Sequence, residues 1–177
     1  MLPIISVVIK ALWLMLPAYI ANPTAAIFGG GKPIDFGKKW HDGQRILGDG
    51  KTFRGLAGGA ACGIVIGLLE MQVATGEPFV IPPITGVIAL SFGALLGDIV
   101  KSFFKRRFGY ERGAGLPLVD QLDFVAGAWV LAYIVDPKWF IENFTLPIII
   151  TVLIVTPILH RATNIIGYHI KVKKEPW

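Results

Sequence analysis

The chain has a single cysteine, Cys62, among its 177 residues, and very little charge. A lone cysteine excludes an intramolecular disulfide framework and any Cys-rich zinc or iron–sulfur site. Asp, Glu, Lys and Arg make up 16% of the chain, against about 25% in an ordinary soluble domain. There is also no internal repeat and no low-complexity tract. The sequence is therefore untypical of a soluble domain.

Apolar residues are abundant instead. They form 54% of the chain, and the mean hydropathy is +0.63. A soluble domain of this size keeps most of its residues at or near water. A chain as apolar as this one therefore requires lipid as a second solvent. Long apolar runs without alternating polar residues argue against a β-barrel. We therefore predict one all-α integral membrane domain over residues 1–177.

Spanning length, about 17–25 residues, is reached by five apolar stretches: 4–28, 55–74, 84–104, 118–135 and 146–170. Loops 29–54 and 105–117, together with the C-terminal tail, hold thirteen Lys and Arg residues: Lys32, Lys38, Lys39, Arg45, Lys51, Arg54, Lys105, Arg106, Arg107, Arg112, Lys171, Lys173 and Lys174. The opposite side holds only Lys138. By the positive-inside rule the N-terminus is outside, the C-terminus is cytoplasmic, and the protein is a multi-pass cell-membrane protein.

Ionisable residues inside predicted spans are costly in lipid and point to function. Asp98 and Lys101 lie in the third span, and Asp120 and Asp123 open the fourth at a spacing that places both carboxylates on one helix face. The third and fourth spans are antiparallel neighbours, so Asp98 is expected to approach this pair in a polar cavity at the cytoplasmic side. Three converging carboxylates require a cation, and Mg²⁺ suits their oxygen ligands best. The alternative is structural, with Asp120 as a helix cap and Asp98 as the ion-pair partner of Lys101.

Two further segments carry polar residues in unusual places. The first cytoplasmic loop scatters glycines among cations, a composition that suits a polyphosphate. It is not a Walker A loop, because Arg45 stands where a glycine is needed. The alternative is a solvated basic loop held against anionic lipid. In the fifth span, His160, Arg161 and Asn164 are placed either to meet a lipid phosphate or to lock helices together.

Residues 97–123 resemble the signature of the phosphatidate cytidylyltransferase family. The matching positions are Ser102, Lys105-Arg106, Pro117, Asp120 and Asp123. Three features depart from it: Glu111-Arg112 replaces a Lys-Asp pair, Gln121 replaces an arginine, and a Gly-His-Gly-Gly run is absent. The short chain, Asn22-Pro23 and the loop motif PIDFGKKWHDGQRILGDGKTFRG resemble the archaeal branch of the family, the CDP-archaeol synthases.

The resemblance implies transfer of a cytidylyl group from CTP to an unsaturated archaeal ether-lipid phosphate, 2,3-bis-O-geranylgeranylglycerol 1-phosphate, with Mg²⁺ as cofactor. It implies a metal-binding group of Asp98, Asp120 and Asp123, with Lys101 completing the catalytic set. The implied substrate-binding residues are Asn22, Asp35, Asp42, Lys51, Thr52, Lys105, Arg106 and Arg161. Membrane lipid is a partner and nucleic acid is not, and glycine-rich helix faces favour close packing and a homodimer.

Three other functions are compatible with parts of the sequence. A small transporter for a cation or phosphate could use the same charged residues, but it needs a polar path to the outer face, where the spans contain little beyond Lys10 and Glu70. These two side chains are expected to reach toward the outer interface. A CDP-alcohol phosphotransferase would show a longer carboxylate motif. A non-enzymatic membrane subunit would explain the basic loops but not three converging carboxylates.

Overall fold

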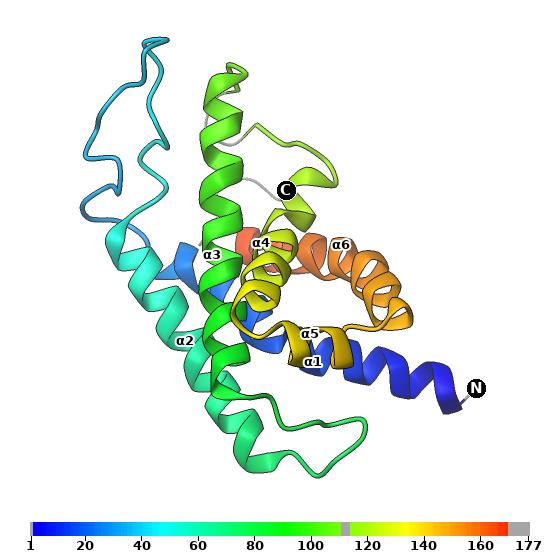
Figure 1. The fold of residues 1–177 in the computed structure, drawn as a ribbon. Helices are drawn as coiled ribbons and strands as arrows, with labels where there is room; N and C mark the ends of the chain where they lie inside the picture. Colours follow the sequence, from blue (N-terminus) through cyan, green and yellow to red (C-terminus); the bar gives the residue numbers. More distant parts are fainter. Residues whose placement is uncertain (1, 111–113, 170–177) are drawn as a thin grey trace.

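The computed structural model describes residues 2–110 and 114–169. In this part of the chain the helices are α1 (Leu2–Ile27), α2 (Phe53–Val73), α3 (Ile84–Arg107), α4 (Val119–Val135), α5 (Pro137–Asn143) and α6 (Leu146–His169). Figure 1 shows the loop after α1 rising beside the C-terminal half of α3, with the connection between α2 and α3 at the opposite end. The basic residues of loop 29–54 and those at 105–107 therefore lie toward one end, whereas Arg112, Lys171, Lys173 and Lys174 lie outside the described residues.

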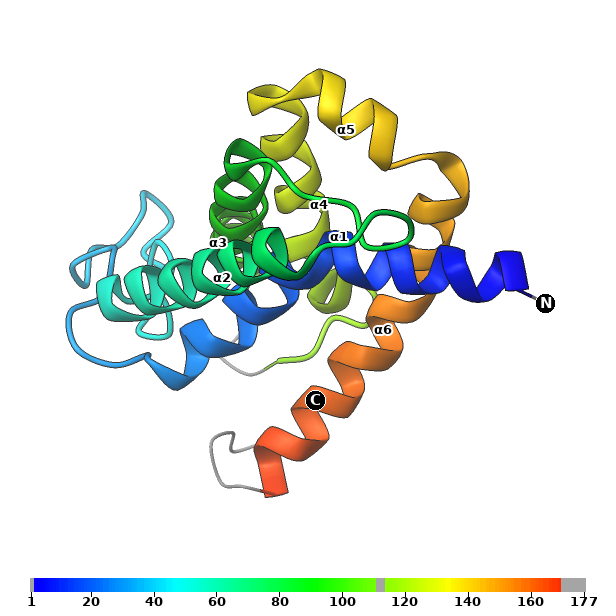
Figure 2. The same cartoon turned by 90° about the horizontal axis from the view of Figure 1, so that it is seen from below.

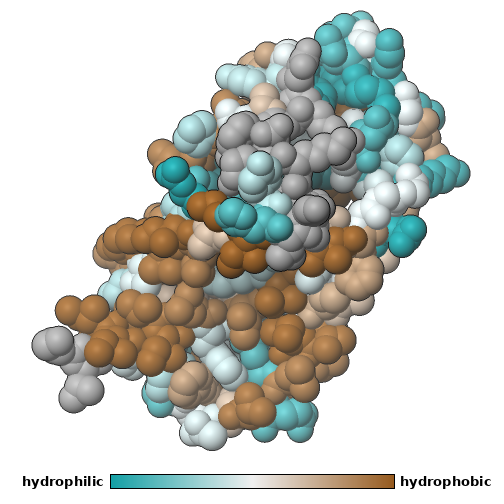
Figure 3. All heavy atoms as spheres, turned by 180° about the vertical axis from the view of Figure 1, so that it is seen from behind, coloured by the Kyte–Doolittle hydropathy of each residue, from teal (hydrophilic) through white to brown (hydrophobic). Residues whose placement is uncertain are grey.

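Helices α1, α2, α3 and α6 are long and apolar enough to cross a membrane. Helix α4 has 17 residues, which is about 25 Å of helix and slightly less than a hydrocarbon core. The fifth crossing therefore stays a prediction. Figure 3 shows a broad hydrophobic band across one face, with hydrophilic residues gathered above it and a smaller group below. This distribution fits a membrane protein whose polar loops stand on both sides of the lipid.

Helix α5 was not predicted, since residues 136–145 read as a plain outer loop. Asp136 starts the helix by accepting a hydrogen bond from the Trp139 backbone N–H at 3.1 Å, and Pro137 occupies the first turn. Both are ordinary helix-start devices. The apolar residues of α5 were too few to register as a span.

Helices α1 and α2 pack closely along a stripe of small residues. On α2, Gly55, Gly59, Gly63 and Gly67 recur at every fourth position and are buried; the first three face α1, and Gly67 faces Val87 of α3. A Cβ atom on Gly59 would lie 2.7 Å from the carbonyl oxygen of Ala21, so only glycine permits this approach. Glu70 continues the same stripe and is only 3% exposed. The expectation that Glu70 reaches the outer interface is therefore wrong, because its position on the packed face outweighs its charge.

Helices α3 and α4 approach each other even more closely, and this contact positions the site. A Cβ atom on Gly127 would lie 2.6 Å from the Cα atom of Gly97, and one on Gly97 would overlap the carbonyl oxygen of Asp123. Asp98 follows Gly97 directly in the chain. The glycine contact therefore brings Asp98 and Asp123 together from two helices.

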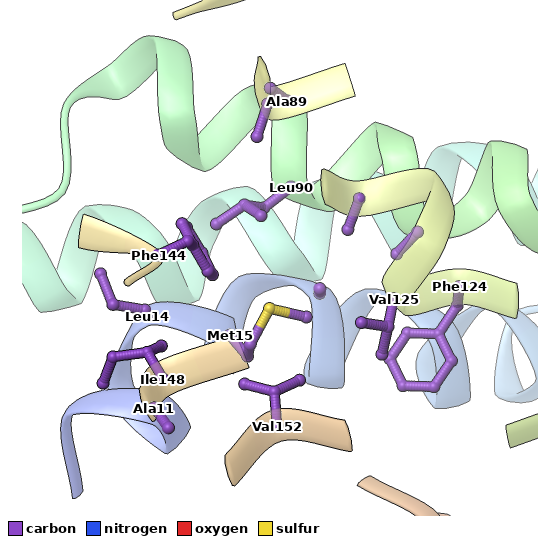
Figure 4. Packing of buried hydrophobic residues seen from close by; sticks show 14 of the residues in the cluster. Ala11, Leu14, Met15, Ala89, Leu90, Phe124, Val125, Phe144, Ile148 and Val152 are labelled. Carbon is purple, nitrogen blue, oxygen red and sulfur yellow. The ribbon is translucent and has the colours of Figure 1, made fainter. Parts of the chain in front are cut away.

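Helix α1 is central and contacts α2, α3, α4 and α6. Figure 4 shows Met15 of α1 meeting Leu90 of α3, Val125 of α4 and Val152 of α6 in the main core cluster. Figure 2 shows α6 running across α1, away from α2 and α3 at its C-terminal end. Residues of α1, α3 and α6 form part of the lining of the cavity described below.

Candidate active site

The loop between α1 and α2 is folded around one buried carboxylate, that of Asp35. Arg45 donates two hydrogen bonds to it, at 2.8 and 3.2 Å. The backbone N–H groups of Gly37, Leu47 and Gly48 donate three more, at 2.9–3.1 Å. Burial alone would raise the pKa of Asp35, but these hydrogen bonds outweigh burial and hold the pKa well below its ordinary value. The pKa of the Arg45 guanidinium is in turn raised above its ordinary value, chiefly by its hydrogen bond to Asp35 and next by its hydrogen bond to Asp49.

This loop is docked on the C-terminal end of α3 by Arg107. The Arg107 guanidinium donates to the backbone oxygen of Arg45 at 2.6 Å and lies 3.2 Å from Asp42 Oδ1. It also stands over the rings of Phe103 and Trp40, at 5.1 and 5.9 Å from their centroids. These contacts hold the middle of the loop, residues 40–45, against α3.

The loop ends by delivering Lys51 to Asp98, with which its ammonium forms an ion pair. Thr52 follows as the N-cap of α2, and its hydroxyl accepts a hydrogen bond from the Gly55 N–H at 3.1 Å. Thr52 thus sets the start of α2 while Lys51 faces α3. The position of Lys51 depends on the folded loop before it and on the helix cap after it.

Asp98, Asp120 and Asp123 meet around the ammonium of Lys101. Its Nζ atom lies 2.8 Å from Asp123 Oδ2, 3.1 Å from Asp98 Oδ1 and 3.3 Å from Asp120 Oδ1. Lys105 lies 3.1 Å from both oxygens of Asp120. We call this group the Asp–Lys cluster; its members are Asp98, Asp120, Asp123, Lys51, Lys101 and Lys105.

The N-terminal turn of α4 places Asp120 in the cluster. Leu118, just before the helix, has a positive φ of 66°, an uncommon conformation for a bulky residue that turns the chain sharply into α4. The Asp120 carboxylate accepts a hydrogen bond from the Leu116 backbone N–H at 2.5 Å. Asp120 therefore braces the segment before α4 as well as pairing with Lys101 and Lys105. It is not the helix cap, because Leu118 occupies that position and no side chain caps it. The ion pair of Asp98 with Lys101 is present, at 3.1 Å.

The Asp–Lys cluster lies at the polar end of a cavity of about 740 Å³. Of the cluster, only Asp123 does not line this cavity. The walls continue away from the cluster along α1 and α6 and are largely apolar there, with Leu12, Leu16, Ile20 and Leu159. One cavity thus joins a charged end to an apolar side within the membrane-spanning helices.

The α1 and α6 walls also carry hydroxyl, amide and imidazole groups. Tyr19 and Thr156 share a hydrogen bond of 2.7 Å, and His160 lies 3.3 Å from Asn164 one turn along α6. All four line the cavity. Tyr19 and Thr156 were missed in the sequence, because a single hydroxyl in an apolar span gives no signal until α1 and α6 are known to pack together.

The predicted site residues separate into two groups. Those that line the cavity are Asn22, Lys51, Thr52, Asp98, Lys101, Lys105 and Asp120. Outside the lining lie Asp123, which pairs with Lys101, and Asp35, Asp42, Arg106 and Arg161. Asp35 holds the loop together, Asp42 pairs with Arg107, and Arg106 bonds the backbone oxygens of Leu47 and Tyr110. The Arg161 side chain is exposed on α6 and faces away from the cavity lining.

The oxygen donors of the Asp–Lys cluster have the chemistry that a hard dication prefers. The Asp123 side chain is 5% exposed, and its Oδ2 atom pairs with the Lys101 ammonium at 2.8 Å. In residues 2–110 and 114–169, however, no three Asp, Glu, His or Cys side chains are gathered tightly enough to hold a metal as they stand. The ammonium of Lys101 occupies the space between the three carboxylates.

Comparison with known proteins identifies relatives along nearly the whole chain. The family model described as CarS-like CDP-archaeol synthase matches residues 4–177. A CDP-archaeol synthase from Methanosarcina barkeri is 57% identical over 175 residues, with 92% of this chain and 100% of the relative covered. A CDP-archaeol synthase from Methanococcoides burtonii is 53% identical over 175 residues, with the same coverage.

A solved structure shares the fold. It is described as an intramembrane enzyme for archaeal membrane lipids biosynthesis. It superimposes with a TM-score of 0.76 at 38% sequence identity, over 89% of this chain and 94% of the other. The helical arrangement described above is therefore that of a membrane enzyme.

Proposed function

This chain belongs to the CDP-archaeol synthase family and is a cytidylyltransferase, and we propose that its lipid substrate is 2,3-bis-O-geranylgeranylglycerol 1-phosphate. The phosphate of this unsaturated ether lipid would accept the cytidylyl group of CTP. The products are pyrophosphate and the CDP-activated lipid, and the lipid product serves membrane phospholipid biosynthesis. The transporter alternative is not favoured by any of these relatives.

One observation carries the proposal: the cationic end and the apolar side belong to the same cavity. The Nζ atoms of Lys51, Lys101 and Lys105 stand at one end, where a triphosphate and a lipid phosphate would both find positive charge. The apolar wall of α1 and α6 is suited to prenyl chains, which are hydrocarbons. A nucleotide and a lipid can therefore meet in this cavity with each substrate in surroundings that match its chemistry.

The reaction needs no nucleophile from the protein, because a lipid phosphate oxygen attacks the α-phosphorus of CTP. A new P–O bond forms there while the bond to the β-phosphate breaks, and the electron pair leaves with pyrophosphate. In this scheme Lys51 and Lys105 hold the β- and γ-phosphates in line and balance the charge of the leaving group. The role of the chain is mainly to position the two substrates and stabilise charge.

A divalent metal, which we propose to be Mg²⁺, would be held by Asp98, Asp120 and Asp123 and would neutralise charge on the transferring phosphate. Lys101 touches all three carboxylates, and its positive charge would keep them together while no metal is bound. The contact of Gly97 with α4 fixes the distance between Asp98 and Asp123. The chain thus holds its acidic ligands in place before substrates arrive.

The proposed orientation places this chemistry at the cytoplasmic side of the cell membrane. The loop docked by Arg107 and the C-terminal end of α3 carry most of the described cations, and both border the Asp–Lys cluster. CTP is a cytoplasmic metabolite that cannot cross lipid, so its site must face the cytoplasm. The glycine stripe of α2 favours a homodimer less than expected, because its glycines already pack against α1 and α3.

The test is pyrophosphate release by the detergent-purified protein supplied with Mg²⁺, CTP and the geranylgeranyl ether-lipid phosphate. We expect Asp123→Asn to lower the rate by about a hundredfold, because a buried carboxylate of the cluster loses its charge. Asp49→Asn is the matched control, since Asp49 is 63% exposed and, among the described residues, pairs with Arg45 outside the Asp–Lys cluster. Release that persists without CTP or without the lipid phosphate would refute the proposed reaction.

A further inference from the structure

The Asp–Lys cluster is balanced in charge, with three carboxylates facing three ammonium groups. Each ammonium touches at least one carboxylate, and Lys101 touches all three. The side chains of Lys101 and Asp123 are 14% and 5% exposed, so solvent screens this contact only weakly. A dication added to the balanced cluster would leave an excess of positive charge in a partly buried place, which is unfavourable.

Lys101 also separates Asp123 from the cavity. Lys101 lines the cavity and Asp123 does not. Since the Nζ atom lies 2.8 Å from Asp123 Oδ2, a cation arriving through the cavity meets Lys101 before it reaches this carboxylate. The lysine side chain has a flexible four-carbon stem, so its ammonium can turn from the carboxylates into the cavity without movement of α3.

We infer that Lys101 is a resident cation that holds the metal position in the empty enzyme, and that metal and nucleotide consequently bind together rather than independently. The negative phosphates of CTP would draw the Lys101 ammonium into the cavity, and the three carboxylates would then be free for the metal. The inference rests on the proposed function, since it assigns an order of events at the same site. It makes Lys101 a coupling residue as well as a substrate contact.

Equilibrium dialysis with Mn²⁺ tests this inference without any turnover. The protein in detergent stays on one side of a membrane that Mn²⁺ and CTP both cross, and no lipid phosphate is added. For the wild type we expect CTP to tighten Mn²⁺ binding about tenfold or more, which is an ordinary size for coupling between two ligands. For Lys101→Met we expect tighter Mn²⁺ binding without CTP, by about the same factor, and little further gain when CTP is added.

Lys105→Met is the matched comparison, because it removes the same charge but leaves Lys101 among the three carboxylates. Lys138→Met changes an exposed lysine on α5 and should leave Mn²⁺ binding unchanged. Equal Mn²⁺ affinity of the wild type with and without CTP would overturn the inference. So would equal tightening by Lys101→Met and Lys105→Met, since net charge and not position would then govern metal binding.

The two proposals fail in different ways. If wild-type protein retains no Mn²⁺ even with CTP and releases no pyrophosphate with the lipid phosphate, the proposed function fails and takes the inference with it. If it releases pyrophosphate but retains Mn²⁺ equally well with and without CTP, only the role of Lys101 is refuted. Loss of Mn²⁺ binding in Lys101→Met, in protein that still shows a cooperative thermal transition, would also refute it.

Discussion

Replacing Asp35 with asparagine should release the loop between α1 and α2 from its folded form. Asp35 accepts two hydrogen bonds from Arg45 and three from backbone N–H groups, and its side chain is fully buried. Asparagine has the same shape but no charge and only one accepting oxygen. The variant therefore keeps the volume of the residue while it removes most of what holds the loop together.

The size of the effect follows from the bonds that are lost. A hydrogen bond to a charged group contributes about 1.5–3 kcal/mol to the stability of the folded loop, and the asparagine variant loses at least the ion pair with Arg45. Arg45 is 27% exposed and retains Asp49 at 2.7 Å, so its charge is not left isolated. We therefore expect a cost of about 3 kcal/mol to the closed loop, which raises the population of the open loop by roughly 150-fold.

Limited tryptic cleavage after Lys38, Lys39 and Arg45 measures this population, because cleavage of an opened segment follows its equilibrium share when opening is fast. Asp42→Asn is the control. It makes the same chemical change in the same loop, but the Asp42 side chain is 38% exposed where it pairs with Arg107, so the expected cost is only about 0–1 kcal/mol. Cleavage of Asp35→Asn at the wild-type rate, or equal acceleration in both variants, would refute the assigned role of Asp35.

Other predictions concern pH, packing and substrate binding. Because the pKa of Asp35 in the folded loop lies below its ordinary value, its contribution to loop stability should be complete above about pH 4 and be lost as the pH falls further, as Trp40 fluorescence would report. Gly97→Ala should lower the melting temperature and reduce activity, since the added Cβ overlaps the carbonyl of Asp123 and the overpacking costs about 1–3 kcal/mol. Lys51→Met should raise the KM for CTP by about tenfold in initial-rate assays while changing the KM for the lipid little.

The long helices could be predicted from the sequence because each is an extended apolar run. The free energy of placing such a run in lipid depends more on its composition than on its neighbours. The predicted span 84–104 lies within the helix Ile84–Arg107, for example. Helix α5 was not accessible, because seven residues with a Pro start carry little hydrophobic signal. The position of Glu70 was misjudged because its charge was given more weight than the glycine stripe that it continues.

The acidic residues of the site show which parts of its geometry can be predicted from sequence spacing. Asp120 and Asp123 share a helix face by spacing alone, and the short connection from the third span brings Asp98 toward them. Spacing did not indicate that Lys101 fills the centre of the group, nor that Asp123 lies behind it. Those facts depend on the direction of side chains between two helices whose separation is set by glycine contacts.

Composition and local motifs were sufficient to indicate lipid as the solvent of this protein, its long apolar helices and its family. Each of these depends on residues that are close together in the chain. Three features could be seen only after folding: Asp35 supports the loop from within, Tyr19 meets Thr156 across 137 positions of sequence, and a charged end and an apolar wall form one cavity. These features arise from contacts between distant segments, whose geometry is set by packing and not by the order of residues.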